Sequence, residues 1–369
     1  MVERDGLRQR IKDLLRELAG LDGVSGHEHA VVQRLQELLT PHAESTMVDT
    51  YGNVFARVNA EGSGPSLMVA AHSDEIGALV KSIEPNGMIR FERVGGVIET
   101  LLIGRHVRIR GLRGVVGVKA GHVQTADERG RAPGMRELYV DIGFDTVAEV
   151  EALGIRVGDA IAYDEPMEEL ANPKRVSGKA LDNRVSCAIV VLLAERLRGE
   201  QLGCTLHVVV TVQEEVGLRG ARIATHRLNP DAAIVVDTVP SGGTPDVDFH
   251  KDLRMRIGGG PVLGLASSGG SSGHHINPAM RDFLRRTAED AGIGLQEAIF
   301  YGGTSDASAV HLVRDGIPSG VINIARRYSH SPVETLDLDD AVDTLLLLEA
   351  SARAFNGETD FGFLAADWG

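Results

Sequence analysis

Residues 205–220 read TLHVVVTVQEEVGLRG, an apolar and β-branched run that stops at two adjacent glutamates, Glu214 and Glu215. The length and composition of this run predict a buried strand, and the glycines after it predict a turn into the next element. Two carboxylates at the end of a buried strand repel each other and lose their hydration. A strand that ends in this way needs a group of opposite charge nearby.

The composition is that of a globular protein with an acidic surface. The chain has 369 residues, of which 43% are apolar and 24% charged, enough for one large domain or two ordinary ones. Asp and Glu (52) outnumber Lys and Arg (38), which gives a net charge of −14. This charge repels nucleic acid and anionic membranes, so the sequence argues against both as partners.

The first residues and the cysteines indicate a cytoplasmic location. The segment MVERDGLRQR is charged and lacks the apolar core of a secretory signal, and the longest apolar runs are too short to span a bilayer. Cys187 and Cys204 both lie in apolar runs, and no CxxC pair exists. We therefore predict two reduced, buried thiols and no thiolate zinc site.

Helix-like and strand-like segments alternate in two parts of the chain. Apolar periodicity predicts helices over 7–19, 28–39, 278–291 and 339–355 and another after KALDNR, with strands at 66–71, 205–212, 232–237 and 319–325. Ser25 is placed near the N-cap of the second helix. This alternation predicts an α/β domain made of residues 1–74 and 174–369.

The segment between these two parts has a different texture. GMIRFERVGG, GRHVRIRGLRGVVGVKAG and ELYVDIGF are short alternating runs broken by glycine, and little helix is evident beyond TVAEVEALG. Such runs predict a small β-barrel or β-sandwich. We expect residues 75–173 to form a β domain inserted into the α/β domain.

Ionisable side chains follow every predicted central strand. They are His72 and Asp74, Asp182, Glu214 and Glu215, Asp237, and His330. Each has an ordinary explanation on its own: a histidine satisfied in the core or on the surface, a helix N-cap, a solvated loop, a turn residue. Together they place nitrogen and oxygen ligands at five strand ends, which α/β proteins bring to one edge of the sheet.

This set of side chains indicates a metal site. Imidazole and carboxylate ligands without thiolate suit Zn²⁺, Co²⁺ or Mn²⁺. The set is too large for one tetrahedral zinc and suits two metals, roughly 3.5–4 Å apart, with one bridging carboxylate. One glutamate of the adjacent pair is then spared to act as a general base.

Six stretches carry a resemblance to a known family. AAHSDEIG, GKALDNR, QEEVGLRGA, VVDT, GGTSDA and RRYSHSPVE follow one another between residues 67 and 334. In this order they resemble the metallo-aminopeptidases of peptidase family forty-two. That family includes glutamyl, deblocking and tetrahedral (TET) aminopeptidases and proteins labelled endoglucanase CelM.

The resemblance implies a mixed-sheet α/β/α co-catalytic zinc peptidase fold with an inserted small β-barrel, PDZ-like or a sandwich. It implies two divalent ions per subunit, with Zn²⁺ favoured over Co²⁺ or Mn²⁺. The implied ligands are His72 and Asp237 for the first metal, Glu215 and His330 for the second, and Asp182 as the bridge. Asp74 then orients the first site, Glu214 is the general base, and the Asp182–Asn183 peptide is cis.

The implied activity is that of an aminopeptidase, which releases N-terminal amino acids from peptides with metal-activated water. Relatives assemble through the inserted domain, so a homo-oligomer is expected, from a dimer to a tetrahedral dodecamer. One alternative is another hydrolase on this scaffold, a deacylase or an endoglucanase. Glycosidases normally use two carboxylates and no metal, which argues against the latter. A catalytically silent metal-bound scaffold is the other alternative, although Glu214 is present.

Two glycine-rich segments have weaker interpretations. GGTSDASAV, residues 302–310, is either a loop beside the substrate pocket or a turn that caps a helix. SSGGSSGHHINP, residues 267–278, contains His274 and His275, and a flexible loop is favoured there over a role in metal binding.

Overall fold

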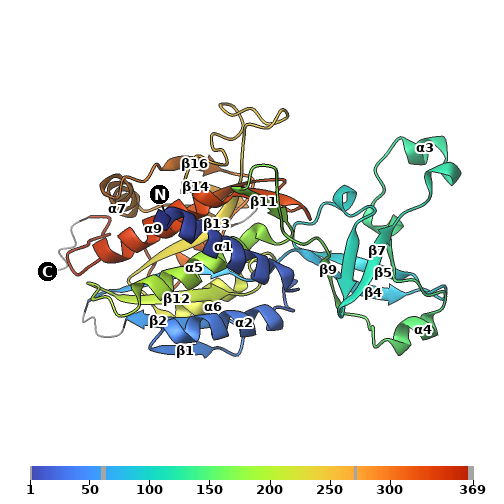
Figure 1. The fold of residues 1–369 in the computed structure, drawn as a ribbon, viewed down its shortest axis with the longest axis horizontal. Coiled ribbons are helices and arrows are strands. Elements are labelled where there is room, and N and C mark those ends of the chain that lie inside the picture. The colour runs from blue at the N-terminus through green and yellow to red at the C-terminus, as the bar shows by residue number, and fades with distance from the viewer. Residues whose placement is uncertain (1, 60–63, 270–271, 365–369) are drawn as a thin grey trace.

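A mixed β-sheet forms the centre of the larger of two units in this computed structural model, which describes residues 2–59, 64–269 and 272–364 (Figure 1). In the described residues the sheet has twelve strands, nine of them in the order β1-β2-β12-β3-β13-β17-β18-β11-β10. These nine are Ser45–Val48, Val54–Asn59, Thr205–Thr211, Ser66–His72, Ala232–Pro240, Ser319–Arg327, Glu334–Asp337, Arg175–Gly178 and Glu168–Glu169. The other three, β14 (Val262–Gly269), β15 (Ser272–His275) and β16 (Gln296–Phe300), extend the sheet beside β17.

The four central strands run parallel to one another. β12 pairs with β3, β3 with β13, and β13 with β17, so their carboxyl ends meet at one edge. The register places His72 opposite Thr211, close to where β12 ends. The strand-end side chains are thus delivered to the same edge of the sheet.

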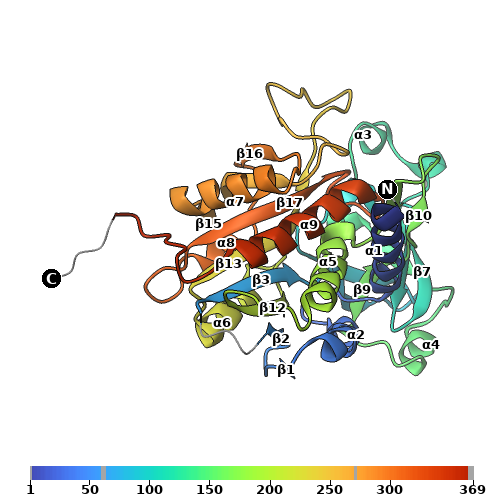
Figure 2. The same cartoon turned by 60° about the vertical axis from the view of Figure 1, so that its left-hand side comes forward.

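Helices cover both faces of this sheet (Figure 2). One face carries α1 (Val2–Gly20), α2 (His29–Leu39), α5 (Leu181–Leu197), α7 (Pro278–Asp290) and α9 (Leu338–Ala354), and the other carries α6 (Arg219–Leu228) and α8 (Ala307–Val310). Strand β3 shows why both faces are buried, because Leu67 and Val69 pack into the core below α5 and α9 while Met68 and Ala70 pack against α6 and α8.

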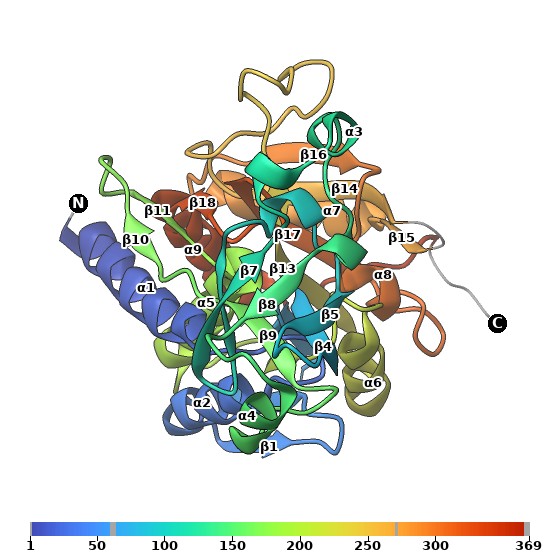
Figure 3. The same ribbon diagram turned by 90° about the vertical axis from the view of Figure 1, so that its right-hand side faces the viewer.

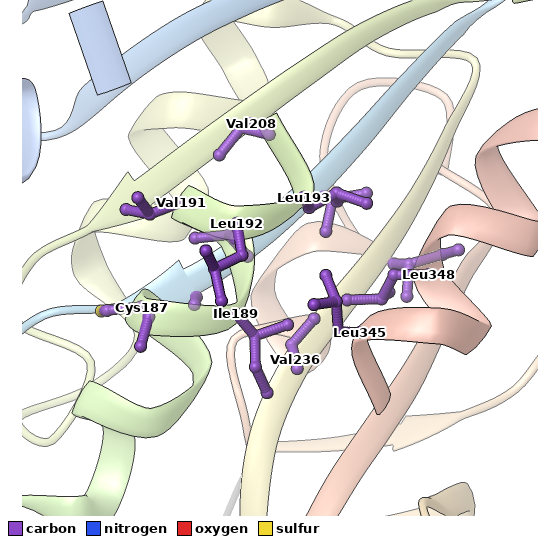
Figure 4. Packing of buried hydrophobic residues seen from close by; sticks show 14 of the residues in the cluster. Cys187, Ile189, Val191, Leu192, Leu193, Val208, Val236, Leu345 and Leu348 are labelled. Atoms are coloured by element: carbon purple, nitrogen blue, oxygen red, sulfur yellow. The ribbon is translucent and has the colours of Figure 1, made fainter. Parts of the chain in front are cut away.

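The larger core lies between α5, α9 and the sheet (Figure 4). Ile189 and Leu192 of α5 face Val236 of β13 and Leu345 of α9, and all four are buried. Cys187 and Cys204 are free and buried, in line with the predicted core thiols. No helix in the described part of the chain combines the length and the apolar composition that a membrane crossing needs.

The smaller unit is a closed barrel of six strands in the described residues, in the order β4-β5-β8-β7-β6-β9 (Figure 3). Its strands are Gly77–Ile83, Ile89–Val94, Tyr139–Asp141, Leu112–Gly117, His106–Ile109 and Ala160–Tyr163, and it also carries α3 (Ala126–Arg129) and α4 (Val147–Ala152). The barrel has its own hydrophobic core. The predicted inserted barrel is confirmed, and the domain boundaries at 74/75 and 173/174 stay a prediction.

A buried ion pair joins the barrel to the larger unit. Lys179, just before α5, donates to both carboxylate oxygens of Glu75 at 2.8 and 3.0 Å and to the carbonyl of Leu21 at 3.0 Å. Glu75 also accepts from the backbone N–H of Gly23 at 2.8 Å. A buried charge that loses its partners costs free energy, so Glu75 is held in contact with Lys179 and Gly23. These contacts fix the position of the chain directly after Asp74.

Candidate metal centre

Two groups of three side chains lie together at the carboxyl edge of the sheet. The first trio is His72, Glu214 and Asp237, and the second is Asp182, Glu215 and His330. Within each trio, one candidate ligand atom from every residue lies within 4.8 Å of the others. The structure thus brings together all five predicted ligands and the predicted base.

The first trio is buried in the larger unit. The Nε2 atom of His72, the last residue of β3, lies 3.5 Å from Oδ1 of Asp237. Asp237 is inside β13 rather than after it, because that strand continues to Pro240. Glu214 follows the end of β12 and is also buried.

Asp182 faces both trios. Its Oδ1 lies 3.3 Å from Nε2 of His72, and its Oδ2 lies 3.6 Å from Nε2 of His330. The second trio is completed by Glu215, whose Oε2 lies 3.5 Å from the same nitrogen of His330. A carboxylate with one oxygen toward each trio has the arrangement that a bridging ligand requires.

The chain around Asp182 is not an ordinary helix start. The N-cap position of α5 is Ala180, and Asp182 has non-helical backbone angles, so Asp182 is not the N-cap. The Asp182–Asn183 peptide is cis, as the resemblance implies. The side chain of Asn183 donates to the carbonyl of Val236 at 2.9 Å, which ties this segment to β13.

Asp74 holds the two glutamates by their backbone. Its Oδ1 accepts from the N–H of Glu214 at 2.9 Å, and its Oδ2 accepts from the N–H of Glu215 at 3.1 Å. Ser25 donates to the same Oδ2 at 2.5 Å. The prediction of Ser25 near a helix N-cap is therefore wrong, because α2 begins after Glu28 and the Ser25 hydroxyl is used by Asp74.

Sequence reasoning missed Arg326 and Glu334. Buried Arg326, near the end of β17, forms ion pairs with Asp182 and with Glu334. Glu334 accepts from the backbone N–H of Asp182 at 2.8 Å and of His330 at 3.0 Å. Both residues lie inside the stretch RRYSHSPVE, in which the sequence pattern assigns a role to the histidine alone.

The electrostatics of the trios favour a bound cation. Burial, with the nearby Asp237 and Glu215, raises the pKa of Glu214 well above its ordinary value, and burial with Asp182 does the same for Glu215. Burial opposes protonation of His72, but Glu214 and the hydrogen-bonding aspartates outweigh it and raise its pKa. The carboxylates therefore resist full ionisation together, and a divalent cation would remove that cost.

The available atoms fit such an ion. Oδ1 of Asp182 is buried and has no hydrogen-bond partner in the described residues, although it lies between the trios. The donor set of imidazole nitrogen and carboxylate oxygen suits zinc, cobalt or manganese. The described residues offer these metals ligands of the right kind in both trios.

The barrel reaches the second trio through Gly96. The carbonyl of Gly96 lies 3.3 Å from Nδ1 of His330. A Cβ on this glycine would lie 2.2 Å from that nitrogen, closer than van der Waals contact allows. The absence of a side chain at residue 96 lets the imidazole keep its place.

We expect Gly96→Ala to weaken metal binding at the second trio by about 10- to 100-fold, because the methyl group displaces His330. Titration of metal-free protein with Co²⁺, followed by absorbance, measures this affinity. Gly121→Ala is the matched control, since a Cβ on Gly121 would have none of the described heavy atoms within 4 Å beyond its chain neighbours. Equal affinities in the two variants would contradict the assigned role of His330.

A cavity of about 410 Å³ opens beside both trios. Residues 302–305 line it, which supports the interpretation of GGTSDASAV as a pocket loop. Asp306 is at the N-cap position of α8 but accepts from the hydroxyl of Thr211 at 2.6 Å instead of capping the helix. The expected loop at 267–278 is wrong for most of its described residues, because 267–269 and 272–275 pair as parts of the antiparallel strands β14 and β15, and α7 begins at Pro278. Residues 270–271 lie outside the described part of the chain.

Comparison with known proteins places this geometry in a family. The family model described as M42 glutamyl aminopeptidase matches residues 52–347, a range that contains both trios. The chain belongs to the M42 glutamyl aminopeptidase family. The resemblance read from the sequence is confirmed, and the chain is a metal-dependent aminopeptidase.

Two curated relatives are each about one-third identical to this chain. The lysyl aminopeptidase of Pyrococcus furiosus is 33% identical over 345 residues, which cover 92% of this chain and 95% of that protein. The glutamyl aminopeptidase of Lactococcus lactis is 32% identical over 353 residues, with 94% and 97% covered.

Solved structures share the fold. The aminopeptidase APDkam598 of the archaeon Desulfurococcus kamchatkensis superposes with a TM-score of 0.90 at 34% sequence identity. The match covers 95% of this chain and 96% of that protein's chain. The TET1 peptidase of Pyrococcus horikoshii, which assembles into a tetrahedron or a large octahedral shell, has a TM-score of 0.83 at 27% identity, with 94% and 100% covered. The predicted fold class is confirmed.

Proposed function

We propose that the two trios hold two divalent metal ions and hydrolyse the first peptide bond of peptide substrates. The position of Asp182, with one carboxylate oxygen toward each trio, carries this proposal. His72 and Asp237 would complete the ligands of one ion, and Glu215 and His330 those of the other. Asp182 would also be a ligand of the ion beside His72. That ion would then not need Glu214 as a ligand, and the Glu214 carboxylate would be free for proton transfer.

The proposed general base is Glu214. When bound, the ions would lower the pKa of water and polarise the substrate carbonyl. Glu214 lines the cavity, so its carboxylate can take a proton from the attacking water and pass it to the leaving amine. Burial, with Asp237 and Glu215 nearby, raises the pKa of this carboxyl, and bound cations would oppose that shift, so that Glu214 would be ionised as a general base has to be. Asp74 positions Glu214 through its backbone N–H.

Cleavage at the N-terminus is proposed to depend on the free α-amine of the substrate, which would bind at the trios. Several carboxylates line the cavity at the trios, and a protonated or metal-held amine fits that end. Blocking the amine removes this contact. Zn²⁺ is the favoured ion, with Co²⁺ and Mn²⁺ as alternatives that the same ligands accept.

We also propose a homo-oligomer in the cytoplasm. The TET1 relative can assemble into a tetrahedron or a large octahedral shell, and residues 77–163, which hold the barrel, expose five large apolar side chains that suit burial against another copy: Ile98, Leu112, Val123, Leu153 and Val157. The two free, buried cysteines are compatible with a reducing compartment.

Hydrolysis of a set of amide and glycan substrates tests this function. Leucine p-nitroanilide should be cleaved, whereas its N-acetylated form and carboxymethylcellulose should not. A chelator should abolish the activity, and Zn²⁺, Co²⁺ or Mn²⁺ added afterwards should restore it. Cleavage of carboxymethylcellulose would favour the endoglucanase alternative, release of acetate from N-acetyl-leucine would favour a deacylase, and full activity in the chelator would contradict the metal centre.

A further inference from the structure

The cavity continues from the trios to a wall without charge. This wall is made by β14, β16 and β17, and six of its residues are Ala266, Ser267, Ala298, Phe300, Val321 and Asn323. The wall carries both apolar side chains and neutral side chains that can form hydrogen bonds. The hydroxyl of Ser267 is buried and has no hydrogen-bond partner in the described residues.

Among the described residues that line the cavity, no ionisable side chain places an unpaired charge at this wall. Six ionisable side chains of the lining belong to the trios. Arg326 is already paired with Asp182 and Glu334.

His274, the remaining ionisable group, is neutral near pH 7. Burial lowers its pKa to about 4, and its Nε2 hydrogen-bonds to the backbone and hydroxyl of Ser319 at 3.2 and 3.1 Å. The wall therefore offers no counter-charge to a cationic or an anionic substrate side chain.

We propose that this wall selects peptides whose N-terminal side chain is uncharged, such as leucine or methionine, and rejects lysine, arginine, aspartate and glutamate. The proposal rests on the proposed function, which fixes the first residue of the substrate at the trios. Its side chain then has to enter the remainder of the same cavity. A charged side chain would lose water there without gaining a partner.

A panel of aminoacyl p-nitroanilides tests the selection. The Leu and Met substrates should have kcat/KM values at least about 10²-fold above those of the Lys, Arg, Asp and Glu substrates. A Lys or Glu substrate that equals or exceeds Leu would overturn the selection while leaving the aminopeptidase activity in place. Failure to cleave any member of the panel with metal added would contradict the proposed function, and the selection with it.

Charge placed on the wall should redirect the preference. Ser267→Asp should raise the Lys-to-Leu ratio of kcat/KM at least about tenfold, and Ser267→Lys should do the same for Glu-to-Leu. Ser267→Asn is the matched neutral control and should keep the wild-type order. Ala266→Asp, with Ala266→Asn as its control, repeats the test at a second wall position. Unchanged ratios at both positions would overturn the assignment of this wall.

Discussion

Glu214→Gln should lower kcat by about 10³-fold while the metal content stays at two ions per subunit. The amide has nearly the size and shape of the carboxylate, so packing around it is preserved. It cannot take a proton from water, which removes the proposed base alone. Steady-state kinetics and elemental analysis of the same sample measure both parts of this result.

Glu28→Gln is the matched control for this variant. Glu28 is a buried carboxyl whose Oε1 accepts from the N–H of Gln213 at 3.1 Å, next to Glu214 in the chain, and it belongs to neither trio. The glutamine keeps that acceptor, so most turnover should remain. Full activity of Glu214→Gln would remove the base assignment, and loss of metal from it would make Glu214 a ligand instead.

Asp182→Ala should lose metal from both trios, because the Asp182 carboxylate has one oxygen toward His72 and the other toward His330. We expect both affinities to fall by more than about 10²-fold, beyond the effect of removing a residue that only orients a ligand. Elemental analysis after dialysis measures the metal, and turnover should fall with it. Because the change also removes a partner of buried Arg326, a thermal melt has to show that the variant is folded.

Asp145→Ala is the control for Asp182→Ala. Asp145 is an exposed aspartate that belongs to the inserted segment and to neither trio. This variant should keep two ions per subunit. Asp182→Ala with the same metal content as Asp145→Ala would contradict the bridging role.

The parts of the fold that depend on local sequence were predictable. β-branched runs such as 205–212 and 319–325 became central parallel strands, and the helices over 278–291 and 339–355 appeared within one residue of their expected ends. The candidate ligands followed because parallel strands bring their carboxyl ends together.

Contacts between distant segments were not predictable in the same way. Closure of the barrel depends on β4 pairing with β9, strands about eighty residues apart, and no local pattern encodes such a pairing. The ion pair between Arg326 and Asp182 and the hydrogen bond from Ser25 to Asp74 likewise join side chains far apart in the chain. The pairing of β14 with β15 was missed because the glycines of these strands have low strand propensity.

Anomalous diffraction from crystals of the zinc-loaded protein tests the two-ion centre most directly. Data collected above and below the zinc edge should show two peaks per subunit, roughly 3.5–4 Å apart, on either side of the Asp182 carboxylate. One peak should lie beside His72 and Asp237 and the other beside Glu215 and His330. A single peak, or peaks away from these side chains, would contradict the account.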